Sequence, residues 1–208
     1  GECPQRSNLP LPQMSDPETL SDVIRNRRTV KPALMDPQKE VPRELLDRLF
    51  ENANWAPTHG FTEPWRFKVF VGQSRNRLAD TLQRIYREAV PEPEFRADKY
   101  EKLGKNPLLA PVVVAICMRR GDNPKIPETE EVEAVACAVQ NMHLTASAEG
   151  LGAFWSSPPI LDAPHAKEFF GLRDIDRCLG LFYIGWLKEG ERWPTSARGA
   201  AAEKVEWM

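Results

Sequence analysis

Apolar residues recur along this chain with two spacings, one typical of helices and one typical of strands. Helical spacing predicts short helices over 17–26 and 43–55, and alternation over 66–71 predicts a strand. The almost wholly apolar run over 112–118 predicts a buried strand. The same patterns predict further helices over 73–90, 130–149 and 164–170, and further strands over 151–155 and 179–187. Strands that alternate with helices indicate an α/β or α+β sandwich built around a sheet.

The helix predicted over 130–149 is the longest and is apolar on nearly all sides. A surface helix normally keeps one polar face, whereas a helix that is apolar all round is buried. We therefore expect this helix to be central, covered either by its own domain or by a partner subunit. Gly150 follows it as a C-terminal capping glycine would.

The length of 208 residues fits one domain, or one large subunit of an oligomer. Residues 1–16 are polar and rich in proline, lack the apolar stretch of a secretory signal, and are expected to form a flexible arm. The pattern weakens over 91–110, where Pro91 and Pro93 end the preceding helix and a short helix over 95–103 follows. This segment is our candidate for a mobile lid. The tail, 188–208, is polar but finishes near an aromatic residue, Trp207, which predicts that it docks.

Charge and composition exclude several classes of partner. The net charge of −2 gives no electrostatic reason to expect nucleic acid or an anionic membrane. No apolar run approaches the roughly 20 residues needed to span a bilayer. The four cysteines lie far apart and show no metal-like or redox-like spacing, which suits a reducing compartment and hence the cytoplasm.

Two polar segments carry the candidate chemistry. Arg27, Arg28 and Thr29 close the first predicted helix, and a guanidinium can donate two parallel hydrogen bonds to a phosphate. Cations at a helix C-terminus are also a common solvated feature, because they interact favourably with the helix dipole. The second segment, 55–65, offers His59, Glu63 and backbone amides that suit the edge of a heteroaromatic ring. Together the two segments describe a binding site for a mononucleotide cofactor.

The order of these segments resembles the nitroreductase family, and most closely its small bacterial nitroreductase-like branch. In that family the first helix ends in Arg-Arg-Ser or Arg-Arg-Thr, and Ala-Pro followed by Gln-Pro-Trp precedes a strand. Here Arg27-Arg28-Thr29 fits the first motif, and Ala56-Pro57 with Glu63-Pro64-Trp65 fits the second. The resemblance extends from Leu20 to Trp207.

The resemblance implies an α+β fold: a three-layer sandwich with a central, mainly antiparallel sheet flanked by helices. It implies a homodimer in which the tail, 188–208, crosses to the partner subunit. It also implies a flavoprotein that passes a hydride from NADH or NADPH through FMN to a small-molecule acceptor, such as a nitroaromatic or a quinone, by a ping-pong mechanism. The flavin carries the chemistry, so no side chain is expected to act as a catalytic acid or base.

Residue roles follow from the same resemblance. Arg27, Arg28 and Thr29 are expected to hold the FMN phosphate and the neighbouring ribityl chain. Lys31 is expected to reach the pyrimidine ring, where a cation stabilises the negative charge of the reduced flavin. Arg198 is expected to join the phosphate site. In the family a Lys commonly lies two residues before this Arg, but Ser196 stands here, so one cation is lost.

The loop and one strand end complete the expected site. His59 and Glu63 are expected to face the flavin, although Glu63 stands where the family has Gln, and an ionised carboxylate only accepts hydrogen bonds. The stretch Trp155-Ser156-Ser157 is expected to pass the reactive edge of the flavin through its backbone amides. The plainer alternatives are a structural His59, a core Trp155 and a free Arg198 in the tail.

The chain has no Gly-x-Gly-x-x-Gly, no Walker loop and no Cys-x-x-Cys. It therefore lacks the signature of a separate nicotinamide-binding domain, which fits a donor that visits the flavin and leaves. Another flavin reaction on the same scaffold, such as dehalogenation or flavin destruction, is one alternative. A flavin-binding carrier or sensor without turnover is another.

Overall fold

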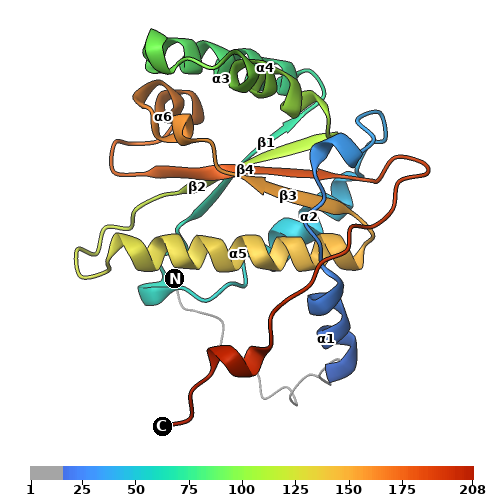
Figure 1. The fold of residues 1–208 in the computed structure, drawn as a ribbon. Coiled ribbons are helices and arrows are strands. Elements are labelled where there is room, and N and C mark those ends of the chain that lie inside the picture. Colours follow the sequence, from blue (N-terminus) through green and yellow to red (C-terminus); the bar gives the residue numbers. More distant parts are fainter. Residues whose placement is uncertain (1–15) are drawn as a thin grey trace.

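The computed structural model describes residues 16–208. It is an α+β sandwich of three layers, a four-stranded sheet between two layers of helices, as expected (Figure 1). The arm predicted over 1–16 lies outside the described residues except for Asp16, which caps the first helix through a hydrogen bond from the Glu18 amide to its side chain.

The sheet consists of β1 (Trp65–Val71), β2 (Val112–Met118), β3 (Gly152–Ser156) and β4 (Arg177–Gly185). The strand order is β1-β2-β4-β3, and every neighbouring pair is antiparallel. All four predicted strands are present, with ends that differ from the sequence prediction by at most two residues. β2 and β4 form the centre of the sheet, and both are almost wholly buried because helices cover both of their faces.

The helices lie in two groups on opposite faces of the sheet (Figure 1). α2 (Arg43–Ala53) and α5 (Glu128–Ala148) pack together on one face, and α3 (Ser74–Ala89), α4 (Ala97–Lys105) and α6 (Pro164–Phe170) cover the other. α1 (Pro17–Asn26) contacts α5 from outside the sandwich. The segment predicted over 95–103 forms α4, two residues later than expected.

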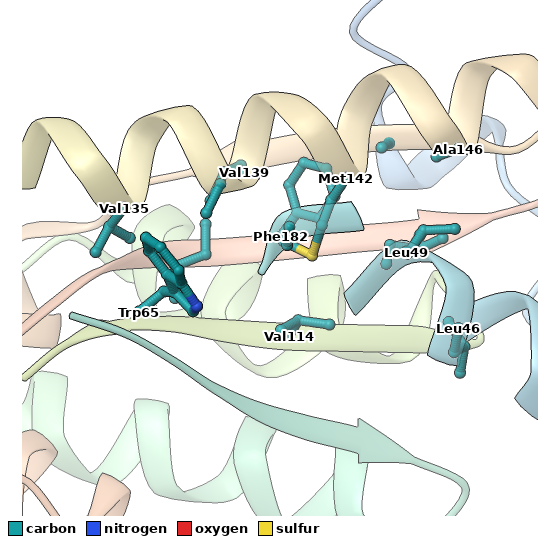
Figure 2. Close-up of a cluster of buried hydrophobic side chains, with 14 of the residues drawn as sticks. Leu46, Leu49, Trp65, Val114, Val135, Val139, Met142, Ala146 and Phe182 are labelled. Atoms are coloured by element: carbon teal, nitrogen blue, oxygen red, sulfur yellow. The ribbon is translucent and has the colours of Figure 1, made fainter. Parts of the chain in front are cut away.

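The side of α5 that faces the sheet forms the larger hydrophobic cluster (Figure 2). Val135, Val139 and Met142 point toward the sheet. They belong to the same buried cluster as Val114 and Phe182 of the central strands. Each of these side chains is buried, and full burial of one large aliphatic or aromatic side chain stabilises a fold by about 1.5–3 kcal/mol. α5 is therefore fixed firmly on the sheet. Its opposite side stays exposed in the single chain, at Ala136, Cys137 and Gln140.

The segment that follows α1 is joined to the free edge of β3. The Val30 amide donates to the Ala153 carbonyl at 2.9 Å, and Thr29 pairs with Ala153 in a parallel bridge. Val30 is fully buried, and a Cβ added at Gly152 would come within 2.8 Å of its side chain. This contact sets the position of the residues on either side of Val30.

We expect Gly152→Ala to destabilise the protein by about 1–3 kcal/mol, because the new methyl group would overlap the rigid, β-branched Val30 in a packed interior. Urea unfolding followed by circular dichroism measures the change. Gly199→Ala is the matched control, since Gly199 is exposed and the change there should stay within about 0.5 kcal/mol. Equal stability of the two variants would contradict the close contact between β3 and Val30.

Candidate phosphate and ring-binding site

Three arginines converge where α1 ends. Arg27 and Arg28 follow the last residue of α1, and the tail brings Arg198 close enough for its charge to lower the pKa of Arg27. The tail is held there by Trp193, whose indole N–H donates to the Asn26 carbonyl at 2.9 Å. The sequence placed Arg27 and Arg28 together, and the tail contact adds the third cation.

The charge of these arginines is not neutralised by any carboxylate of residues 16–208, since no ion pair among those residues includes them. Burial is the largest cause of the lowered pKa of Arg27, followed by the charges of Arg198 and Arg28. One end of the Arg28 guanidinium donates to the Arg25 and Arg27 carbonyls, at 2.5 and 2.8 Å, and its buried Nε has no hydrogen-bond partner in this part of the chain. A phosphate group fits this cluster because it supplies the missing negative charge and accepts hydrogen bonds from guanidinium groups.

His143, on the buried side of α5, contacts both Arg27 and Arg28. Its Nε2 lies 3.0 Å from the Arg28 carbonyl oxygen and 3.5 Å from Nη1 of Arg27, and its ring meets Phe182 edge-on. A carbonyl oxygen can only accept, so Nε2 carries the hydrogen. The pKa of His143 is lowered to about 4. Burial is the largest cause and the charge of Arg27 acts in the same direction, whereas the hydrogen bond to the Arg28 carbonyl acts against them. The ring is thus neutral at pH 7.

His143 lies inside the apolar helix predicted over 130–149, and the apolar pattern does not single it out as a functional residue. A polar ring among apolar neighbours was the available signal, because a buried polar side chain needs a hydrogen-bond partner from elsewhere in the fold.

Thr29 and Lys31 lie next to the arginines along the edge of β3. Only the backbone of Thr29 is engaged, through its bridge to Ala153, and its side chain is exposed. Lys31 is also exposed and forms no ion pair within residues 16–208. Both side chains are therefore available to a ligand bound beside the arginines.

The stretch Trp155-Ser156-Ser157 is divided between the two faces of the sheet. Trp155 packs against the cluster under α5, and its indole N–H donates to the Leu179 carbonyl at 3.1 Å. Ser156 faces the opposite layer, and Ser157 is exposed beyond the strand. The polar group of the Trp155 side chain is already used, so this residue can offer a ligand only its backbone and ring.

The loop around η2 (His59–Phe61) lies at the other end of α5. His59 Nδ1 contacts a carboxylate oxygen of Glu130 in the first turn of that helix. Phe61 and Glu63 have positive φ angles of 53° and 42°, and the Phe61 side chain is 89% exposed. A bulky residue held at positive φ is strained, and such strain is concentrated at functional sites.

The two predicted parts of the site are not adjacent within one chain. His59 lies at Glu130, whereas Arg27 lies at His143, and thirteen residues of helix span roughly 20 Å. The structure brings Arg27, Arg28, Thr29 and Arg198 together and leaves His59 and Glu63 at a second location.

No helix among residues 16–208 combines the length and apolar character needed to cross a bilayer. No group of three or more His, Cys, Asp or Glu side chains in the same residues is placed to hold a metal ion.

The family model described as "Nitroreductase family" matches residues 24–186 of this chain. YdjA of Escherichia coli strain K12, named as a candidate NAD(P)H nitroreductase, is 29% identical over 142 residues, which are 68% of this chain and 75% of YdjA. The 5,6-dimethylbenzimidazole synthase of Rhodospirillum rubrum is 30% identical over 190 residues, covering 86% of this chain and 87% of the synthase.

Among solved structures, the FMN-dependent nitroreductase NfnB of Mycobacterium smegmatis, in complex with NADPH, has the same fold. The TM-score is 0.70 at 21% identity, and the match covers 93% of this chain and all of that one, 100%. The expected fold class is thereby confirmed.

The lowered pKa of His143 predicts a specific pH dependence of stability. As pH falls from 6.5 toward 4, His143 is protonated in the unfolded chain but stays neutral in the folded protein. Above pH 6.5 the titration of His143 should therefore not reduce the free energy of unfolding. Between pH 6.5 and pH 4 this titration alone should reduce the free energy of unfolding by about 3 kcal/mol.

Urea unfolding at pH 7 and pH 4.5 measures this effect. His143→Gln keeps an N–H donor but removes the titration, so its stability should fall by about 2 kcal/mol less than that of the unmodified protein. His165→Gln, at an exposed histidine, is the control and should behave like the unmodified protein. Identical pH dependence in all three proteins would show that the folded state tolerates a charged His143.

Proposed function

We propose that this chain, which belongs to the nitroreductase family, is an FMN-dependent oxidoreductase that passes electrons from NADH or NADPH to a small-molecule acceptor. The observation that carries the proposal is the cluster of Arg27, Arg28 and Arg198, which lacks a counterion within the described residues and leaves the buried Nε of Arg28 unbonded. NfnB, which has the same fold, is FMN-dependent and binds NADPH.

The arginines would hold the FMN phosphate, and the exposed hydroxyl of Thr29 would meet the ribityl chain beside it. His143 would act as a positioning residue, because its bond to the Arg28 carbonyl fixes the backbone between the two neighbouring arginines. Ser196 stands where a Lys is expected, and its hydroxyl accepts a hydrogen bond from Arg198 at 2.5 Å. With that cation absent, Arg28 would carry more of the phosphate charge.

Lys31 would lie beside the pyrimidine ring, where its ammonium group stabilises negative charge. His59 and Glu63 would face the ring from the loop, and the backbone of Trp155, Ser156 and Ser157 would pass its reactive edge. When bound, FMN would supply reversible two-electron transfer, so that donor and acceptor use one pocket in turn in a ping-pong mechanism. The protein binds and orients the participants and excludes water, and no side chain needs to act as an acid or base.

A homodimer is part of the proposal. His59 and Glu63 lie too far from Arg27 within one chain to share a ligand with it, but a partner's loop could meet these arginines across a two-fold axis. The exposed side of α5, with Ala136 and Cys137, is the surface that such a partner would cover. The tail, 188–208, contacts its own chain through Trp193 and Arg198, so the part that would cross to the partner is its end, which includes Trp207, 93% exposed in the single chain.

The acceptor would be a nitroaromatic, a quinone or a related compound. The protein would act in a reducing compartment such as the cytoplasm, where the thiols of Cys117 and Cys178 stay reduced. These two residues are buried on adjacent strands and are unbridged in the structure.

A second candidate function comes from the synthase of Rhodospirillum rubrum, which matches most of this chain. Its product, 5,6-dimethylbenzimidazole, contains the same dimethyl-substituted benzene ring as FMN. In this alternative the bound flavin is the source of the product and is consumed.

One experiment separates these functions. The purified protein, loaded with FMN, is supplied with NADH or NADPH, with and without a nitroaromatic or a quinone, in air. Donor oxidation that depends on the acceptor, with the flavin intact, supports the oxidoreductase. Loss of flavin with release of dimethylbenzimidazole supports the synthase, and a flavin that is bound but not reduced supports a carrier or sensor.

Arg28→Ala should weaken FMN binding by about 1.5–3 kcal/mol, the usual contribution of a hydrogen bond to a charged group. Fluorescence titration of FMN against the apoprotein measures this difference. Arg84→Ala removes the same charge from an exposed site on α3 and should leave the affinity unchanged. Unchanged affinity in Arg28→Ala would show that the phosphate binds elsewhere.

Ala136→Glu should convert the dimer to a monomer and weaken FMN binding with it, because a carboxylate would be buried on the proposed interface without a partner. Light scattering coupled to size-exclusion chromatography gives the mass. Ala89→Glu, at the exposed end of α3, makes the same substitution away from that surface. A monomeric mass for the unmodified protein at micromolar concentration would contradict the dimer.

A further inference from the structure

A cavity of about 470 Å³ lies on the face of the sheet opposite α5. Its floor is formed by Leu181 and Tyr183 of β4, and its apolar walls by Leu103 of α4 and Ile160. Small-molecule sites usually have this size and this mostly apolar lining, with a few polar groups that fix the orientation of the ligand. The arginine cluster is not part of the lining.

One polar group of the cavity lining is the hydroxyl of Tyr183. The residue is only 3% exposed, and its hydroxyl forms no hydrogen bond among residues 16–208. Burial raises the pKa of Tyr183, so the hydroxyl stays neutral. A hydroxyl that lines a cavity and has no protein partner can form a hydrogen bond with a ligand that brings a polar atom to this position.

The mouth of the cavity carries a different chemistry. Lys99 and Lys102 line it from α4, with Asn106 and Glu94 beside them. Neither lysine forms an ion pair within the described residues, so the mouth has two ammonium groups and one carboxylate. An anionic group is therefore favoured at the mouth, above an apolar floor.

The wall that carries these lysines is the segment expected to be a lid, 91–110, and it is held firmly on α3. Gln83 Nε2 donates to the Tyr100 carbonyl at 3.0 Å, and Phe95 packs between Tyr86 and Tyr100 with ring centres 5.3 and 5.7 Å away. A Cβ at Gly104 would overlap the Gln83 side chain. These contacts give the cavity a preformed wall.

We propose that this cavity is a second ligand site, which binds a small aromatic carboxylate bearing a polar substituent at its far end. The aromatic ring lies on Leu181 and Ile160, the carboxylate lies between Lys99 and Lys102, and the far substituent meets the Tyr183 hydroxyl. The site goes beyond the proposed flavin function, and its lining includes none of the three arginines. It does include Ser156, from the stretch proposed to pass the flavin edge, so the test must distinguish the two sites.

Isothermal titration calorimetry with 6-hydroxy-2-naphthoate tests the proposal on the protein saturated with FMN. One molecule should bind per chain. The double variant Lys99→Gln/Lys102→Gln should weaken binding at least about tenfold, through loss of charge-assisted bonds. Lys105→Gln, an exposed lysine of α4 outside the lining, is the matched control and should bind as the unmodified protein does.

A comparison with 2-naphthoate, which lacks the hydroxyl, tests the far end. The unmodified protein should prefer the hydroxylated ligand by about two- to tenfold, and Tyr183→Phe should remove that preference. The proposal is overturned if no heat is observed, or if the preference survives in Tyr183→Phe. It is also overturned if the ligand displaces FMN or shifts the flavin spectrum and ignores the lysine substitutions, because it would then occupy the flavin site.

Discussion

The packing of α5 on the sheet is the constraint on which the functional geometry depends. One side of this helix is buried by Val135, Val139 and Met142 over the central strands (Figure 2). Because these contacts fix the helix in rotation and along its axis, they also fix its polar residues. His143 reaches the Arg28 carbonyl from one end, and Glu130 reaches His59 from the other. Both proposed parts of the flavin site are therefore positioned by one helix.

The arginine cluster is unfavourable by itself, and this is informative about its purpose. Burial and like charge both lower the pKa of Arg27, so the folded chain holds cations that repel one another. A ligand that binds only the folded state stabilises it in proportion to the logarithm of its concentration over Kd. An anion bound here would thus stabilise the junction of α1, the edge of β3 and the tail together.

The two faces of the sheet differ in what they offer. The α5 face carries an exposed helix side, a strained loop and an uncompensated positive charge, all of which suit a partner subunit and a phosphate. The opposite face is covered by α3, α4 and α6 (Figure 1). It encloses a cavity with a mostly apolar lining and two lysines at its mouth. β3 borders both, because its alternate residues Trp155 and Ser156 point to opposite faces. Because side chains alternate along a strand, β3 borders both proposed sites.

The amino-acid sequence by itself determined the secondary-structure elements and the residues of the proposed phosphate site. Apolar spacing predicted the ends of the strands and of the α-helices to within two residues. It could do so because burial of one face imposes a period on the residues that form that face. Arg27, Arg28 and Thr29 could be recognised because they are consecutive and end a helix. Only the tertiary structure decided what joins them. Arg27 and His143 are 116 residues apart, and the Trp193 contact that brings the tail to α1 spans 167. No local period encodes such contacts, since they depend on how whole elements pack. For the same reason the sequence could not show that Trp155 already uses its N–H, or that His59 lies at the far end of α5 from Arg27.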